Sequence, residues 1–395
     1  MGGAWPSLGR TTVPWHPVAG LLEVSRRSLR ATPASFEAAV VPMIAEAGLE
    51  LSGDLAADLD EATRLLAAFD AGGAGEIAPF ASVLLRSESA ASSQIENLTS
   101  SSRALAEAEI GEGNRANAGL ILANVRTMQA ALDLAGRLDE AAVLDMHRAL
   151  MAQQAQHVPG RWRDQQVWLG GSALHPGDAD YVPPIASDVP NLMADLVTFM
   201  DRDDLPPLAL AALSHAQFET IHPFTDGNGR TGRALLHSVL LHTGAIRRVT
   251  VPISAGLLAI RDDYFAALTA YRTGEVEPIL RCVAEAARNG TRIGERLVGA
   301  LRAVRDDWSD AVTARAGSAS WAVLDLLVRQ PVVTARVVTL ELGVSAPTAQ
   351  TALRRLVEDG VLLESTGHRR NRVYRAPAVL RALDDYAEGL GRRIV

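Results

Sequence analysis

The sequence contains no lysine, a single cysteine and few aromatic residues. All 38 basic residues are therefore arginine, which suits bidentate contacts to phosphate and also fits a bias in genomic base composition. The lone Cys282 excludes an intramolecular disulfide, and the lack of any apolar run of membrane-spanning length excludes a transmembrane helix. The first residues also lack the apolar core of a signal peptide, so we expect a cytoplasmic protein without a membrane partner.

Alanine and leucine are the most prominent residues that are present. The 395 residues are 48% hydrophobic and 21% charged, which is enough apolar material for two or three domains with their own cores. Sparse aromatics and abundant helix formers predict a mainly α protein in which strands are a minority. A net charge of -8 argues against a protein that coats nucleic acid over its whole surface, although it leaves room for a local basic patch.

The N-terminal part changes character at Pro33. Residues 1–33 are rich in Pro, Gly and Trp without a helical period, and they predict a loop or an extended arm. Apolar residues then recur at helical spacing from Phe36 to Ala71 and again from Phe80 to Ile110, with a glycine-rich interruption between them. Residues 1–115 are therefore expected to form an N-terminal arm and a helical segment.

The central part, residues 116–300, is predicted to be a helical core with one β-like insertion. Helical periodicity covers residues 117–134, 140–151, 191–200, 207–221, 227–242, 257–271 and 276–304. Between the second and third of these segments, β-formers at 166–169, a Gly170-Gly171 turn and a return at Tyr181-Val182 predict a short β-hairpin or flap.

The C-terminal part, residues 315–395, follows a different order of elements. Helical periods and two short strand-like segments are predicted at 321–328, 334–342, 347–359, 361–364 and 372–375. Three helices followed by a strand pair are typical of a winged helix-turn-helix domain.

The stretch HPFTDGNGRTGR at residues 222–233 combines a histidine, an acid, a glycine turn and two cations. Pro223 disfavours the α region for His222, so His222 should leave the preceding helix and project from a loop. The small residues of GNG, placed before a helix, allow backbone N–H groups to converge on an anion, and the helix dipole adds to this attraction. Phosphate is the expected ligand of this site.

Two arginines and one carboxylate complete this arrangement. Arg230 and Arg233 lie one turn apart on one helix face, where two guanidinium groups could clamp the phosphates of a nucleotide. Asp226 is placed to hold Mg²⁺, which proteins usually bind through one or two carboxylates and substrate phosphates. These residues therefore indicate phosphoryl or nucleotidyl transfer, with His222 as the base for an attacking hydroxyl.

A metal hydrolase is a different reading of the same region. His215, Glu219 and His222 fall at i, i+4 and i+7, which would place them on one face if the helix continued. Pro223 breaks that face at its third member. Metal analysis for bound zinc separates the two readings.

The whole string resembles the signature of the Fic (filamentation induced by cAMP) family, His-Pro-Phe-x-Asp/Glu-Gly-Asn-Gly-Arg-x-x-Arg, at every defined position. The resemblance covers about residues 35–290 and implies transfer of AMP from ATP to a Ser, Thr or Tyr hydroxyl of a protein, including the chain itself. It implies that His222 is the base, that Asp226 holds Mg²⁺ and that Phe224 is a buried anchor. The implied phosphate-binding residues are Gly227, Asn228, Gly229, Arg230 and Arg233.

The resemblance also suggests roles outside the motif. The segment Val167, Trp168 and Leu169 corresponds to the flap that Fic proteins place over the active site, which implies a strand edge that aligns a target peptide. An ordinary surface hairpin is the alternative. Tyr264 looks similar to a family position near the adenine, although an aromatic residue at helical spacing also fits a core position.

SSQIENL at residues 92–98 matches the inhibitory helix of one Fic class, Ser/Thr-x-x-x-Glu-Gly/Asn, at Ser92, Glu96 and Asn97. Without the motif at 222–233, the same residues would read as a solvated helix face. The resemblance implies that Glu96 pairs with Arg233 and keeps ATP from binding productively. Because a glutamate near such a site can also orient water, removal of AMP from a modified protein is the alternative chemistry.

The C-terminal part is locally basic. From Ala311 to the end there are twelve arginines and eight acidic residues, a net charge of +4 in a chain whose total is -8. DNA contacts are predicted for Thr348, Gln350, Thr351 and Arg354 in the third helix and for Arg369, Arg370, Arg372 and Arg375 in or beside the wing. A DNA-binding regulator with a Fic core is therefore a second hypothesis, and dimerisation or target docking is the alternative use of the module. We expect a homodimer.

Overall fold

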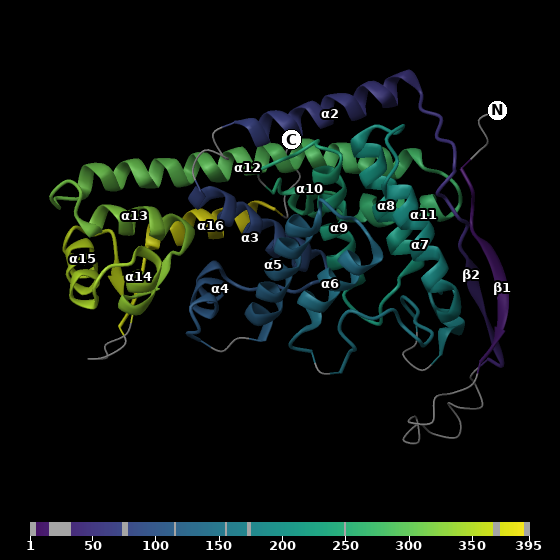
Figure 1. Cartoon of the computed structure of the whole chain (residues 1–395), viewed down its shortest axis with the longest axis horizontal. Coiled ribbons are helices and arrows are strands. Elements are labelled where there is room, and N and C mark those ends of the chain that lie inside the picture. Colours follow the sequence, from purple (N-terminus) through teal and green to yellow (C-terminus); the bar gives the residue numbers. More distant parts are fainter. Residues whose placement is uncertain are drawn as a thin grey trace. The chain divides into compact units, whose positions relative to one another are not determined.

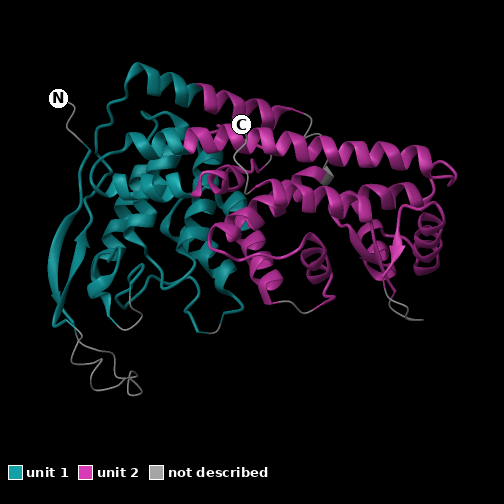
Figure 2. Cartoon of the chain, turned by 180° about the vertical axis from the view of Figure 1, so that it is seen from behind, with its two compact units in different colours: residues 1–60, 130–243, 262–282 teal, residues 61–129, 244–261, 283–395 magenta. Residues whose placement is uncertain are grey.

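The computed structural model of the chain is mainly helical (Figure 1). Two small sheets lie within the residues that it describes. It describes residues 5–15, 33–72, 78–113, 116–154, 156–171, 175–248, 250–365 and 372–390. The chain forms two compact units, each assembled from separate stretches of sequence (Figure 2). Unit 1 comprises Met1–Asp60, Ala130–Thr243 and Asp262–Cys282, and unit 2 comprises Glu61–Gln129, Gly244–Arg261 and Val283–Val395.

Unit 1 begins with an antiparallel strand pair, β1 (Gly9–Pro14) and β2 (Ser35–Val40), in which Gly9 lies opposite Val40. The extended arm expected before Pro33 is thus confirmed within the described residues. The helix expected from Phe36 is wrong, because α2 (Gly53–Ala71) begins only at Gly53. Phe36 and Ala38 are buried at a spacing of two, and so short an apolar run does not distinguish a strand from a helix before its pairing partner is known.

Four helices of unit 1 build the surroundings of the motif. They are α6 (Glu140–Met151), α7 (Val189–Met200), α8 (Pro207–Ile221) and α9 (Asn228–His242). Every residue of α8 from Leu208 to Ile221 is buried, as expected for a helix that is apolar on most of its faces and has neighbours on all sides. α8 packs against α7 and α9, and α9 also packs against α6.

The remaining central helices are α5 (Ala116–Leu134), α10 (Ile253–Ala259), α11 (Arg261–Arg272) and the long α12 (Glu277–Ala311). In unit 2, α10 packs closely against α12 at Gly256. A Cβ at this position would lie only 2.0 Å from the carbonyl oxygen of Ala286, so the close approach requires glycine. The single helix expected over residues 257–271 is wrong, since α10 and α11 are separated at Ile260.

In unit 2, the helix expected from Phe80 to Ile110 is also divided, into α3 (Ala78–Ile95) and α4 (Ser102–Glu109). α3 packs against α10. α3 ends because Asn97 adopts a left-handed conformation with φ of 62°, while the N–H of Leu98 bonds to the carbonyl of Ser93. This hydrogen-bond pattern is the Schellman motif, in which glycine or asparagine is favoured at the left-handed position.

The C-terminal part of unit 2 contains α13 (Ala319–Arg329), α14 (Ala335–Leu342) and α15 (Ala346–Glu358). Strands β3 (Val332–Thr334), β4 (Leu363–Glu364) and β5 (Val373–Arg375) form an antiparallel sheet in the order β3-β5-β4, and α16 (Pro377–Gly389) follows. The three helices and the strand pair are confirmed, whereas β3 and α16 were not predicted from the sequence.

Polar contacts join α3 and α4 to this C-terminal part. Arg86 of α3 donates to the carbonyl of Arg329 at 2.5 Å, and its guanidinium lies 3.3 Å from Glu109 of α4. At the start of α4, the N–H of Ser102 bonds to Asp384 of α16 at 3.2 Å. The helices on both sides of Glu96 are therefore each fastened to residues 319–389.

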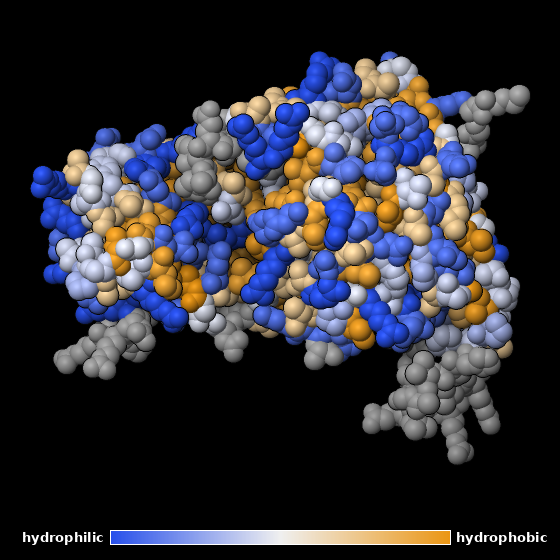
Figure 3. Space-filling model, viewed as in Figure 1, coloured by the Kyte–Doolittle hydropathy of each residue, from blue (hydrophilic) through white to orange (hydrophobic). Residues whose placement is uncertain are grey.

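The surface drawn in Figure 3 is mixed, with hydrophobic residues interspersed among hydrophilic ones. Within the stretches that the structure describes, no helix combines the length and the apolar character needed to cross a bilayer.

Candidate active site

The loop between α8 and α9 carries the motif. α8 ends at Ile221, and His222 follows in the left-handed region at φ 50° and ψ 61°, with its N–H bonded to the carbonyl of Phe218 at 2.9 Å. The prediction that Pro223 takes His222 out of the helix is confirmed. A left-handed conformation is uncommon for a residue other than glycine, and it persists only where the surroundings hold it.

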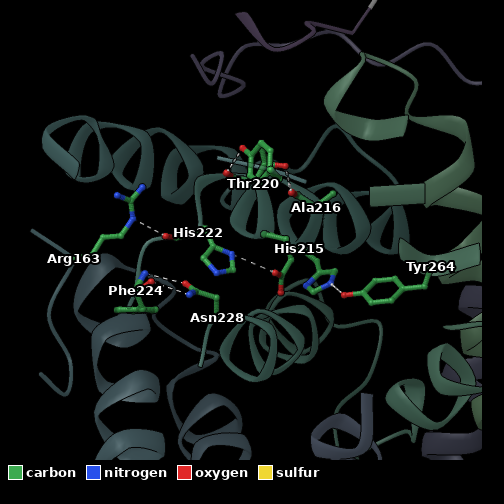
Figure 4. Close-up of polar contacts among 10 residues, drawn as sticks. Arg163, His215, Ala216, Thr220, His222, Phe224, Asn228 and Tyr264 are labelled. Atoms are coloured by element: carbon green, nitrogen blue, oxygen red, sulfur yellow. Dashed lines mark hydrogen bonds and ion pairs between the residues drawn. The ribbon is translucent and has the colours of Figure 1, made fainter. Parts of the chain in front are cut away.

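Asn228 closes this loop (Figure 4). Its side chain accepts a hydrogen bond from the N–H of Phe224 and donates one to the carbonyl of the same residue, both at 2.9 Å. Gly227 precedes α9 with φ of 76°, and a Cβ there would lie 2.7 Å from Leu150 of α6. The start of α9 is thus a compact turn, and the first backbone N–H groups of the helix lie at the positive end of the helix dipole.

His147 of α6 packs against the motif loop. The sequence alone predicted no function for this residue. Its ring stacks on Phe224 with centroids 3.6 Å apart, accepts a hydrogen bond from the N–H of Gly160, and bonds through Nε2 to the carbonyl of Asp226 at 3.2 Å. This pattern requires the neutral tautomer with a proton on Nε2. Burial lowers the pKa of His147 to about 4, which keeps that form populated.

His157 is a second histidine that the sequence did not single out. Its Nδ1 lies 3.0 Å from the hydroxyl of Thr225, and its Nε2 lies 3.8 Å from the carboxylate of Asp226. The segment that follows α6 therefore contacts the motif loop at two successive residues. Only the fold could reveal this contact, because 68 residues separate His157 from Thr225.

The charged residues of the motif differ in exposure. The side chains of Arg230 and Arg233 are buried, whereas that of Asp226 is 42% exposed and lies 3.6 Å from the Arg230 guanidinium. Asp226 thus presents carboxylate oxygens at the surface beside the start of α9, which suits a hard cation such as Mg²⁺. Within the described residues, no cluster of three His, Cys, Asp or Glu side chains has an arrangement that could hold a metal, so the zinc reading has no support.

The imidazole of His222 sits in a mostly buried, positively charged environment. Burial lowers its pKa to about 3, and the guanidinium groups of Arg163 and Arg272 act in the same direction. Its Nδ1 lies 3.9 Å from the carboxylate of Glu219. A neutral imidazole at neutral pH is the form that can accept a proton.

Tyr264 is a core residue in this structure, being 1% exposed. Its hydroxyl lies 2.7 Å from Nε2 of His215 and also receives a hydrogen bond from Arg233. Burial, helped by the charge of Arg233, lowers the pKa of His215 to about 3. These contacts favour the interpretation of Tyr264 as a core residue, which packs beside Arg233 and helps to hold it. A contact between Tyr264 and adenine stays a prediction.

The predicted flap is a minimal hairpin. Leu169 and Tyr181 form an isolated bridge, with the N–H of Leu169 bonded to the carbonyl of Tyr181 at 2.8 Å, and Gly170 and Gly171 turn the chain at positive φ. Val167, Trp168 and Leu169 are half-buried. The sequence did not predict the support from the N-terminal strands: Trp168 packs edge-on against Trp15 at 5.6 Å, and Ala39 of β2 donates to the carbonyl of Val182.

The segment that resembles an inhibitory helix is the end of α3. Ser92 is fully buried, Glu96 is half-buried and Asn97 is exposed in its left-handed conformation. The preference for asparagine or glycine at this position of the pattern thus has a local explanation, because the residue that ends the helix must adopt a left-handed conformation. Glu96 belongs to unit 2 and Arg233 to unit 1, so their pairing stays a prediction.

The motif residues of this site lie within a segment whose sequence matches a known protein family. Residues 137–240 match the sequence model of the Fic/DOC family, so the chain contains a Fic/DOC family domain. This confirms the family resemblance for these residues.

Named relatives match a part of the chain. It is 32% identical over 145 residues to "Protein adenylyltransferase Fic" of Nematostella vectensis, covering 36% of this chain and 30% of that protein. It is 30% identical over 165 residues to "Protein adenylyltransferase fic-1" of Caenorhabditis elegans, covering 42% of this chain and again 30% of the relative. The chain therefore spans less than a third of the length of these curated relatives.

Among solved structures, a Fic family protein from Desulfovibrio desulfuricans G20 is similar with a TM-score of 0.51 and 21% sequence identity. The superposition covers 83% of this chain and 97% of that one. At this identity the likeness concerns the fold alone.

Proposed function

We propose that the chain is a protein adenylyltransferase that moves AMP from ATP to a Ser, Thr or Tyr hydroxyl of a protein. The observation that carries this proposal is the placement of a neutral His222, outside its helix, directly before the glycine-capped start of α9. The Fic/DOC domain and the names of the relatives support the same reaction.

In this reaction the triphosphate would lie at the start of α9. Backbone N–H groups of Gly227, Asn228 and Gly229 would bind phosphate oxygens there, and Arg230 and Arg233 would contact the phosphate chain. Asp226 would hold Mg²⁺ together with the phosphates, and the bound ion supplies neutralisation of the charge on the phosphate oxygens.

His222 would accept the proton of the target hydroxyl. As the hydroxyl oxygen bonds to the α-phosphorus of ATP, the bond from that phosphorus to the oxygen bridging to the β-phosphate breaks, and pyrophosphate leaves. The flap residues Val167, Trp168 and Leu169 would align the target chain along their backbone. Because Trp168 packs on Trp15, its side chain contributes to flap stability.

Glu96→Gly is expected to raise AMP transfer about 10- to 100-fold. The reason is that Glu96 would compete with ATP for Arg233, and a hydrogen bond to a charged group contributes about 1.5–3 kcal/mol. The measurement is incorporation of labelled AMP, from ATP labelled at the α-phosphate, into the chain itself and into added cell proteins. Mass spectrometry identifies the modified residues.

Glu112→Gly is the matched control, because Glu112 is also half-buried and follows the end of a helix in unit 2. Equal labelling by wild type and Glu96→Gly would contradict inhibition by Glu96. Loss of AMP from a previously modified protein, in place of labelling, would favour the removal reaction.

We also propose that residues 315–395 form a winged helix-turn-helix that binds DNA. The order of α13 to β5 supports the fold, and Thr348, Gln350, Thr351 and Arg354 are all exposed on α15, opposite its buried face. In the wing, Arg372 pairs with Glu364 at 3.2 Å, while Arg369 and Arg370 lie outside the described residues.

Duplex DNA is expected to shift the electrophoretic mobility of the chain, with an affinity that falls as salt rises because arginines release counterions from phosphates. Arg354→Ala should weaken this binding, and Arg381→Ala, on α16, serves as an arginine control. No shift at low salt would leave dimerisation or target docking as the use of the module. Sedimentation of the same samples tests the expected homodimer.

A further inference from the structure

Arg163 holds three segments of unit 1 together by hydrogen bonds to backbone carbonyls. The side chain is buried. Its Nε donates to the carbonyl of His222 at 2.9 Å (Figure 4). Its two terminal nitrogens donate to the carbonyls of Gln165 at 3.1 Å and Pro184 at 2.5 Å. The backbone N–H of Arg163 adds a bond to the carbonyl of Pro223 at 2.9 Å.

The three acceptors have a common relation to the site. His222 belongs to the motif loop, whereas Gln165 and Pro184 lie on the two sides of the flap bridge between Leu169 and Tyr181. One guanidinium therefore fixes the base of the flap, at both of its ends, to the backbone of His222. The flap is also tied to α8, since the hydroxyl of Tyr181 donates to the carbonyl of Thr220 at 2.6 Å.

Burying this cation has an energetic cost. Desolvation lowers the pKa of Arg163 to about 10, and Tyr181 and Asp188 oppose that effect. The planar fork of arginine reaches three carbonyls in fixed directions at once, which the point charge of lysine does not. The hydrogen bond to the His222 carbonyl also holds the peptide that follows this left-handed residue.

We propose that Arg163 is a positioning residue, which keeps the flap and the imidazole of His222 in one fixed relation for the transfer of AMP. This inference rests on the proposed function. The charge of Arg163 also faces His222, together with that of Arg272 from α11 and the carboxylate of Glu219 from α8. Arg163 itself contacts no reacting group, since all its described side-chain acceptors are carbonyls.

The test uses the full chain carrying Glu96→Gly, with Arg163→Lys as the principal variant and Arg163→Gln as the second. The matched control is Arg202→Lys, because Arg202 likewise donates to two backbone carbonyls of unit 1, those of Ala45 and Ala47. Self-labelling with ATP labelled at the α-phosphate gives the maximal rate and the half-saturating ATP concentration. Hydrogen exchange of peptides from the flap and the motif loop is measured without ATP.

For Arg163→Lys, the maximal rate should fall roughly 30- to 100-fold while the half-saturating ATP concentration changes less than about three-fold, because misplacement of reacting groups by about 1 Å reduces the rate without removing the phosphate contacts. Exchange should rise together in peptides covering 165–184 and 218–228, and Arg202→Lys should change neither quantity. An unchanged rate, faster exchange in only one of the two peptides, or loss of cooperative unfolding in both Arg163 variants would overturn the assignment. If no variant transfers AMP at all, the proposed function fails, and the exchange data alone decide on Arg163.

Discussion

Replacement of His222 with alanine is expected to reduce the rate of AMP transfer by about 10²- to 10⁴-fold, the usual contribution of a general base. The expectation follows from the position of the imidazole, which leaves α8 at a left-handed residue and is kept neutral by burial and by two nearby guanidinium groups. His147, which stacks on the same loop, is not expected to replace it, because both of its ring nitrogens are already hydrogen-bonded, to Gly160 and to Asp226.

The experiment compares Glu96→Gly with the double variant that also carries His222→Ala, using labelled ATP and measuring ATP binding by calorimetry. Binding should change little, because His222 is expected to contact the hydroxyl and not the phosphates. His242→Ala, which removes an exposed histidine at the other end of α9, is the control. Full labelling by the His222→Ala variant would refute the role of His222 as the base.

Gly227→Ala is expected to destabilise the chain by about 2–5 kcal/mol and to reduce ATP binding. A left-handed backbone costs a residue with a Cβ about 1–2 kcal/mol, and overpacking adds roughly 1–3 kcal/mol. Overpacking applies here because the new Cβ would lie 2.7 Å from Leu150 and 3.2 Å from the sulfur of Met151. Movement of the turn would also displace the N–H groups at the start of α9.

Gly244→Ala separates the two contributions. Gly244 has a similar φ of 74°, but a Cβ there would meet nothing within 4 Å, so only the backbone cost of about 1–2 kcal/mol applies. Urea denaturation followed by circular dichroism gives both values. Equal losses for the two variants would show that the contact with α6 adds nothing.

The part of the fold that follows from local pattern was predictable. The bounds of α6 and α8 coincide with the helical periods read from the sequence, because each helix has a clear start and stop: Asp139 caps the first, and Pro207 and Pro223 delimit the second. The wrong expectation at Phe36 concerns a strand whose identity depends on pairing with β1. Pairing between distant residues leaves no periodic signal in either strand alone.

The candidate site divides in the same way. The residues of the motif lie within one turn and a loop, so their spacing alone indicated a base, an anion site and a carboxylate. His147, His157 and Arg163 reach this loop from another part of the chain, and their types alone gave no reason to select them. What distinguishes them is the carbonyl or hydroxyl that each contacts, which only the folded structure brings within reach.

The attachment of α3 and α4 to residues 319–389 restricts the chain between these two helices. Arg86 on one side and Ser102 on the other hold the ends of a short connection that contains Glu96. A segment with both ends fixed has lost most of its conformational entropy in advance, so ordering its side chains against a partner costs less than it would in a free loop. Separation of the C-terminal part would return that entropy to the segment and weaken any contact that Glu96 makes.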